Sequence, residues 1–375
     1  MPCLLAAPAP EPAPDTGASA RTPSPTPADP RIIAQLRART LASLRRRAAS
    51  RTPAHDPPRP TVPGSWLAQL RPGTTVRLGA LDLTPITHPG PFAPAPMLMH
   101  EAMSERVLRI DEMRAPAVGR LDVCNTGSAP VLLMAGQIIA GGLQDRVMIE
   151  DAVLGAGARE SVTVSCIEHL RWSAPVGATG FSATPEMLDP LRRRRITHTT
   201  PQGGADQGAL WLSIDRVLAR HRVPSRTASY RDVALRLRPH VLAMLDRVPR
   251  APSQVGLMAC LRGRLVALDL FGHSASWAAI AELLERSYLL ASLDLLERRR
   301  QRRRPGTPHR GRHHQRHAPP ARHQPDGWLA SLVATRPVPR PGTGTSAAFS
   351  VTSAELFGAG LFHGDVPLHL AAFGN

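Results

Sequence analysis

Five side chains with chemically useful groups crowd into seven positions of SVTVSCIEHLRW, residues 161–172. They are Cys166, Glu168, His169, Arg171 and Trp172. A carboxylate can act as a general base and a thiolate as a nucleophile, while a guanidinium can grip an anionic group with two hydrogen bonds. Glu168 is the favoured candidate base, because it lies past the end of the preceding predicted strand, where a cleft can form.

Cys166 is the less favoured candidate, as a nucleophile. Alternation in SVTVSC places Val162, Val164 and Cys166 on one strand face, and the two valines mark that face as buried. A buried free thiol behaves as a small apolar group, whereas a reactive thiol needs an electropositive, partly exposed setting. Cys166 to Arg171 is also a Cys-x4-Arg spacing, one residue shorter than the Cys-x5-Arg loop of cysteine phosphatases.

The upstream segment LQDRVMIE, residues 143–150, adds an amide and a second guanidinium. Alternation places Gln144 and Arg146 on one strand face, and the preceding Gly141–Gly142 pair allows a backbone or a ligand to approach closely. We expect Gln144 and Arg146 to lie across from Ser165 and Thr163, so that one sheet face presents an amide, a guanidinium and hydroxyls. A solvated sheet face or a buried arginine–glutamate pair would give the same pattern.

The elements that position these residues indicate an α+β fold. Residues 75–166 form a Gly-punctuated, antiparallel or mixed β-sheet region, in which TVRLGALDLTPI (75–86) is expected as one strand. Amphipathic helices follow at 206–222 and 230–248, then a β-hairpin at 254–271 and a long helix at 277–299. We expect the C-terminal strand to return to the domain.

The charge of the chain points away from nucleic acid as its main partner. The formal net charge is +17, yet residues 64–297 hold 25 arginines and 22 acidic residues, so most of the excess lies in the flanks. The chain contains no lysine, which is typical of codon bias in a GC-rich genome rather than of selection for phosphate contacts. The flanks also lack the interleaved aromatic residues that stack on single-stranded bases.

The chain divides into four segments by composition. Residues 1–63 are predicted to be disordered and basic, with a helix at 31–49 as one alternative; residues 64–297 form the main domain, 298–326 an Arg/His/Pro linker, and 327–375 a helix and strands that complete the domain. No segment reaches the roughly 18–20 apolar residues of a membrane span. The four cysteines form no CxxC pair, so we expect a cytoplasmic protein with no metal site.

Two stretches of the chain carry a family resemblance. LLMAGQIIAGGLQDR (132–146) and VTVSCIEHLRW (162–172) resemble LLLDGEELVGAKQNR and PVSCVEQGRW of the ARG and Rhodanese-Phosphatase-superfamily-associated Protein domain family. DQ at 206–207, SRT at 225–227, QVGLM at 254–258, DLF at 269–271 and the closing PLHLAAF also resemble that family. The family's acidic DGEE is replaced here by Ala135–Ile138, so that Gln137 can hydrogen-bond a ligand but cannot take a proton.

The resemblance implies a setting in ADP-ribose or phosphorylated-nucleotide metabolism, and it names no reaction. Our first hypothesis is a site for an anionic nucleotide-type ligand, bound or hydrolysed without a cofactor. In this hypothesis Arg146 and Arg171 clamp the anion, and Gln144, Ser165 and Gln137 orient it. Trp172 packs against a base or sugar. Glu168 is the general base of any hydrolase or phosphoesterase activity.

The alternative is a non-catalytic interaction module, in which the Cys-Glu-Arg-Trp corner is a structural latch. A ligand site would leave Arg146 and Arg171 converging on a concavity, whereas a latch would satisfy both with protein groups. The oligomeric state is left open by the sequence.

Overall fold

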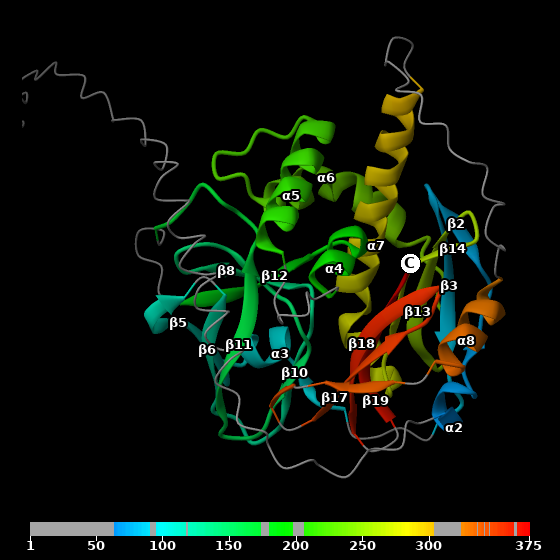
Figure 1. The fold of residues 1–375 in the computed structure, drawn as a ribbon, viewed down its shortest axis with the longest axis horizontal. Helices are drawn as coiled ribbons and strands as arrows, with labels where there is room; N and C mark the ends of the chain where they lie inside the picture. Colours follow the sequence, from blue (N-terminus) through cyan, green and yellow to red (C-terminus); the bar gives the residue numbers. More distant parts are fainter. Residues whose placement is uncertain are drawn as a thin grey trace, which may run out of the picture.

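The structure is a computed structural model in which three β-sheets and seven helices are seen among the described residues (Figure 1). It describes residues 64–90, 95–117, 119–173, 180–197, 206–303, 324–335, 337–340, 342–344, 346–363 and 366–375. The predicted α+β class is confirmed. The segment 31–49, for which a helix was one alternative, lies outside the described residues.

The largest sheet has nine strands and joins distant parts of the chain, with every pairing antiparallel. Its path runs through β1 (Arg71–Pro72), β3 (Leu81–Thr87), β13 (Gln254–Leu261), β14 (Arg264–Leu270), β19 (Val366–Gly374), β18 (Leu356–His363), β17 (Ala347–Thr352) and β15 (Val338–Arg340), with β2 (Val76–Leu78) beside β3. Because β19 pairs with β14, the predicted return of the C-terminal strand to the domain is confirmed.

Two smaller sheets fill the other half of the molecule. The six-stranded sheet has the order β12 (Phe181–Met187), β8 (Gln137–Gly141), β9 (Arg146–Met148), β11 (Arg159–Cys166), β6 (Arg120–Asn125) and β5 (Leu108–Ala117). The four-stranded sheet has the order β16 (Thr343–Gly344), β10 (Ala152–Leu154), β7 (Val131–Leu133) and β4 (Met97–Leu98), and two of its three pairings are parallel. The edge strands β12 and β5 contact each other, so the six-stranded sheet curls towards a barrel.

Helices separate and cover these sheets. They are α2 (Gly64–Leu67), α3 (Met99–Ser104), α4 (Pro190–Thr197), α5 (Gln207–His221), α6 (Tyr230–Leu245), α7 (Ser274–Arg302) and α8 (Pro325–Val333). In Figure 1, α7 stands between the large sheet and the smaller ones, and its apolar side packs on one face of the large sheet while α2 and α8 cover the other. None of the helices in the described ranges is both long and apolar enough to cross a membrane.

The structure differs from the predicted elements at three places. Residues 75–86 form a hairpin rather than one strand, because Gly79 turns the chain between β2 and β3 with φ +60°. The long helix runs to Arg302, beyond the predicted linker boundary at 298. Strand β12 and helix α4 were not predicted, since PLRRRRIT has the composition of a solvated segment, yet Arg192 and Arg193 are buried by acidic partners.

Candidate functional site

The pairing of β9 with β11 differs from the expected register. Arg146 lies opposite Cys166, and Val147 lies opposite Ser165. Directly paired residues project to the same face, whereas neighbours along a strand project to opposite faces. Arg146 and Cys166 therefore share a face and Ser165 lies on the other, so the expected grouping of Arg146 with Ser165 and Thr163 is not formed.

Arg146 is enclosed at the end of the curled sheet and is 0% exposed. Its Nη1 donates to the Gln144 carbonyl and side-chain oxygens, both at 3.2 Å, and its Nη2 lies 3.6 Å from Oε1 of Glu112. The guanidinium carbon lies 5.9 Å from the ring centroid of Trp172, which is 42% exposed. Nε and Nη2 have no hydrogen-bond acceptor in the described structure. A buried arginine therefore retains unused donors beneath an accessible indole.

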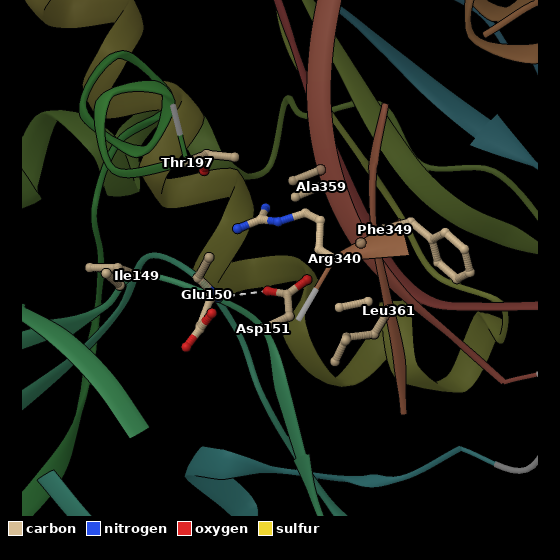
Figure 2. A pocket seen from close by; sticks show the side chains of 12 residues that line it. Ile149, Glu150, Asp151, Thr197, Arg340, Phe349, Ala359 and Leu361 are labelled. Carbon is tan, nitrogen blue, oxygen red and sulfur yellow. Dashed lines mark hydrogen bonds between the residues drawn. The ribbon is translucent and has the colours of Figure 1, made fainter. Parts of the chain in front are cut away.

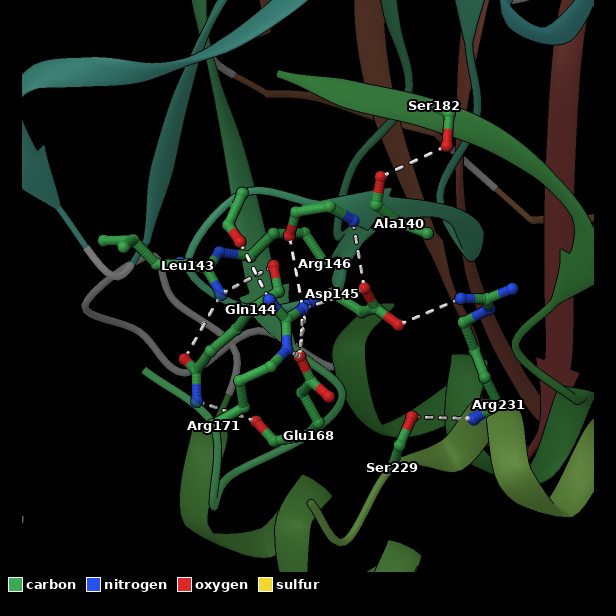
Figure 3. A network of polar contacts seen from close by, with 12 residues as sticks. Ala140, Leu143, Gln144, Asp145, Arg146, Glu168, Arg171, Ser182, Ser229 and Arg231 are labelled. Carbon is green, nitrogen blue, oxygen red and sulfur yellow. Dashed lines mark hydrogen bonds and ion pairs between the residues drawn. The ribbon is translucent and has the colours of Figure 1, made fainter. Parts of the chain in front are cut away.

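Arg171 is bound by protein groups on every side (Figure 3). Its Nε donates to Glu168 Oε1 at 2.6 Å, and Nη1 donates to the carbonyls of Gly142 and Ser173 at 2.9 and 2.8 Å. Nη2 donates to the Gly141 carbonyl and to Asp145 Oδ1, at 3.3 and 3.1 Å. These contacts tie the β8–β9 turn to the end of β11.

Glu168 is part of the same clamp and is 3% exposed. Besides its ion pair with Arg171, its Oε1 accepts the backbone amide of Asp145 at 2.9 Å, and its carbonyl accepts Gln144 Nε2 at 3.1 Å. Glu168 and Arg171, three residues apart, are thus bound directly to each other. Of the Cys-Glu-Arg-Trp corner predicted as a structural latch, Glu168 and Arg171 make these contacts, and we use the name latch below for Glu168 and Arg171 together with Gln144 and Asp145.

Close backbone approach explains the glycine pair that precedes β9. A Cβ on Gly141 would lie 2.5 Å from the Gly180 carbonyl oxygen, and one on Gly142 would lie 2.3 Å from the Phe181 ring. Both glycines also have positive φ, +127° and +50°. Here the approaching group is the protein's own backbone and side chain, at the start of β12, so the glycines do not by themselves indicate a ligand.

The chemistry of Cys166 follows from its burial. It is 0% exposed, and loss of solvation raises the pKa of the thiol to about 11, against an opposing effect of the Arg146 charge. The thiol therefore stays protonated near neutral pH, which disfavours a nucleophilic role. Gln207 holds the backbone of Cys166 on both sides, with its Oε1 accepting the amide and its Nε2 donating to the carbonyl, each at 2.8 Å.

Gln137 lies away from this group, at the opposite end of β8 from Gly141. Its Oε1 accepts the Met134 amide at 2.8 Å, and its Nε2 has no acceptor in the described structure. The structure therefore brings Gln144, Arg146, Cys166, Glu168, Arg171 and Trp172 together, and places Ser165 on another face and Gln137 at a distance along the strand. Their functional roles stay predictions.

Comparison with known protein families adds one finding to this geometry. Residues 69–373 match the model of the ARG and Rhodanese-Phosphatase-superfamily-associated Protein domain. The chain belongs to this family. The match extends across the whole latch and through the returning strand β19, as the resemblance of the sequence motifs predicted. Neither the curated proteins nor the solved structures contain a significant match.

The ARG and Rhodanese-Phosphatase-associated domain also holds a buried charge cluster that the sequence analysis missed. It consists of Asp151, Arg193, Asp269, Tyr288 and His369. Asp269 comes from the DLF segment and His369 from PLHLAAF, two of the segments that carried the family resemblance. In the sequence, Asp269 and His369 are each a polar residue within an otherwise apolar strand, which could have marked them as unusual. Only the pairing of β14 with β19 shows that the two side chains meet. No group of three metal-ligating side chains is found within the described ranges.

Proposed function

We propose that this domain binds a small anionic molecule of the nucleotide type, with Arg146 as the anion-binding group and Trp172 as the surface that packs its base or sugar. The observation that supports this is a fully buried guanidinium whose Nε and Nη2 find no acceptor among the described residues. A buried donor without a partner costs roughly 1–3 kcal/mol, and more when it is charged. Carboxylate or phosphate oxygens would satisfy both donors at once.

The carboxylate of Glu112 would compete with a bound anion for the guanidinium of Arg146. Its Oε1 lies 3.6 Å from Arg146 Nη2 and accepts the Leu143 amide at 3.0 Å, while its Oε2 has no partner in the described part of the chain. The distance exceeds that of a strong charge-assisted hydrogen bond, about 2.7–2.9 Å. An anion would therefore replace a loose ion pair, and neutralising Glu112 should favour the anion.

The nucleotide part of the proposal rests on Trp172 and on the family. Trp172 is 42% exposed beside the buried cation, so a base can pack on its ring once the anion has replaced Glu112 at the fully buried Arg146. The family description associates the domain with ARG proteins and with the rhodanese-phosphatase superfamily. We take that association as support for an ADP-ribose or phosphorylated-nucleotide ligand.

The test is a thermal-shift panel on the full chain with ADP-ribose, NAD, nucleotide mono- and diphosphates, and phosphate. A ligand at about 100 times its Kd should stabilise the protein by about 2.7 kcal/mol. Glu112→Gln should strengthen the response, and Trp172→Ala should weaken the response to nucleotides more than the response to phosphate. Arg146→Gln should abolish both, and the exposed Arg109→Ala is the matched control. A response that Arg146→Gln leaves intact would refute the proposal.

A second candidate function, a structural latch in a non-catalytic interaction module, is favoured by the contacts of Arg171. All three nitrogens of its guanidinium have protein acceptors. Arg171→Ala should then cost about 3 kcal/mol or more in the free energy of unfolding, because it leaves the Glu168 carboxylate buried without its cation. If this loss occurs and no anion in the panel raises Tm, the latch is the better account.

Hydrolysis is tested separately from binding. Glu168→Gln keeps the shape of the side chain but removes the charge that would accept a proton. Product formation from ADP-ribose or a nucleotide by the wild type, lost in Glu168→Gln at unchanged ligand binding, would assign the base. Turnover that survives in this variant would exclude Glu168 from that role.

A further inference from the structure

A line of hydrogen-bonded charges leads from the interior of the protein to an open pocket. Asp151 Oδ2 lies 2.7 Å from Nδ1 of His369, and Nε2 of His369 lies 3.0 Å from Asp269 Oδ1. His369 and Asp269 are both 0% exposed, while the side chain of Asp151 is 7% exposed and lines the pocket (Figure 2). Asp151, His369 and Asp269 form what we call the relay.

The inner end of the relay is held rigidly. Arg193 donates to both oxygens of Asp269, at 2.9 and 2.6 Å, and the Tyr288 hydroxyl donates to Oδ2 at 2.6 Å. With His369 protonated, two carboxylates face one imidazolium and one guanidinium, so the buried charges balance. His369 then donates from both ring nitrogens, and Asp151 is fixed by the ring and by the Ala135 amide at 2.7 Å.

The pocket has an anionic wall, a cationic side chain and an apolar floor. Glu150 and Asp151 line one side, Arg340 reaches across from β15, and Phe349 and Leu361 are among the apolar residues (Figure 2). The space enclosed by its walls is small, about 30 Å³, well below the roughly 300–1,000 Å³ of sites for drug-sized ligands. It suits a compound of a few heavy atoms better than a nucleotide.

Arg340 is the feature that distinguishes this pocket from a purely structural charge cluster. Its guanidinium makes no hydrogen bond or ion pair with any residue that the structure describes, although two carboxylates line the same pocket. Glu150 is instead engaged with hydroxyl groups, since its Oε1 accepts Thr163 Oγ1 at 2.8 Å and Thr343 Oγ1 at 3.3 Å. A cation with no partner in the described part of the chain and a positioned carboxylate thus face the same space.

We propose that this pocket is a second ligand site, which takes a small anion that also carries a hydroxyl or amino group. Arg340 holds the carboxylate or phosphate of that molecule, and Asp151, fixed by the relay, accepts a hydrogen bond from its hydroxyl or amino group. A ligand bound by both Arg340 and Asp151 needs the Asp151 carboxylate in a fixed position, and the hydrogen bond from His369 provides this. This site is independent of the one around Arg146.

The first experiment compares lactate with propionate, which differ by one hydroxyl group, and glycerol 3-phosphate with inorganic phosphate. The full chain is labelled with ¹⁵N-histidine, and the ring signals of His369 are identified by their absence in His369→Gln. We expect a saturable shift of these signals, with lactate bound at least about tenfold more tightly than propionate, because one hydrogen bond to a charged acceptor is lost. The phosphate pair shows whether the anionic group is a phosphate instead.

Variants assign the contacts and separate the two sites. Arg340→Ala should abolish the response to every probe, and Asp151→Asn should remove the preference for the hydroxylated member of each pair. Arg146→Gln should leave the response unchanged, and exposed Arg109→Ala is the control for general loss of positive charge. If no probe shifts the His369 signals at millimolar concentration, or if Arg340→Ala responds as the wild type does, the proposal is overturned.

Discussion

The stability of this protein should fall as the pH rises from neutral towards 9, and His369 is the cause. Burial by itself lowers the pKa of this ring, but the charges and hydrogen bonds of Asp151 and Asp269 outweigh burial and raise the pKa to about 9. The charged groups around it are these two carboxylates and Arg193, and the Tyr288 hydroxyl also binds Asp269. The folded protein therefore holds a proton that the unfolded chain releases near pH 6.5.

The sign and the size follow from linkage. A raised pKa in the folded state stabilises the protein fully below pH 6.5, and this stabilisation is lost as the pH passes through about 9. Between these limits the free energy of unfolding should fall by about 1.4 kcal/mol per pH unit, and by roughly 3 kcal/mol in all. The lowered pKa values of His88 and His100, caused mainly by burial, act in the opposite direction and below pH 6.5.

Urea unfolding of the full chain at several pH values between 6.5 and 8.5 measures this slope. The window ends at 8.5 because Cys166 and Cys260, whose pKa values are raised to about 11 and 12 mainly by burial, contribute above it. His369→Gln is the comparison, and it should be less stable at pH 6.5 and show a flatter profile. A flat wild-type profile would refute a protonated His369 in the folded state, whether or not the variant folds.

Three further predictions concern packing and thiol reactivity. Ser292→Ala should cost roughly 2 kcal/mol in urea unfolding, because the buried hydroxyl bonds an amide and a carbonyl of the β2–β3 turn, both at 2.8 Å; a loss below 0.5 kcal/mol would contradict this. Gly136→Ala should lower Tm, since φ is +95° and the added Cβ would lie 2.7 Å from Arg193 Cδ, and an unchanged Tm would count against it. Iodoacetamide under native conditions should label Cys124, which is partly exposed, before Cys166; peptide mass spectrometry checks the order, and the reverse order would be inconsistent with the structure.

Local patterns were enough to predict several of the elements around the site. The alternation that placed Val162, Val164 and Cys166 on a buried face is found in β11, and all three are at most 3% exposed. The helix predicted at 206–222 forms as α5 and is capped by Asp206, whose Oδ1 accepts the Ala209 amide at 2.9 Å. These features depend on a few neighbouring residues, whose spacing and capping chemistry can be read along the chain.

Features that depend on distant partners could not be predicted in the same way. The run PLRRRRIT is strongly basic, and only the folded chain supplies Arg193 with Asp269, 76 residues away, and brings Asp294 within 3.6 Å of Arg192. Likewise, alternation predicted which side chains of segment 143–150 share a face. It did not predict the register, that is, which residue of β11 pairs with each of them. In the structure only Arg146–Met148 of this segment is regular strand, and Arg146 lies opposite Cys166.

Two arginines, Arg146 and Arg193, are each 0% exposed, but they differ in how their guanidinium groups are satisfied. Arg193 places two nitrogens on both oxygens of a fully buried carboxylate, and within the described ranges only its Nε lacks an acceptor. Its burial is balanced by charge within the protein, which is what a structural role requires. Arg146 has only a carboxylate at 3.6 Å, belonging to a partly exposed glutamate, and leaves both Nε and Nη2 without acceptors among the described residues. Both side chains are equally shielded from water, but Arg146 has two nitrogens without an acceptor among the described residues and Arg193 has one. An anion added to the protein should therefore act on Arg146 and leave Arg193 unaffected.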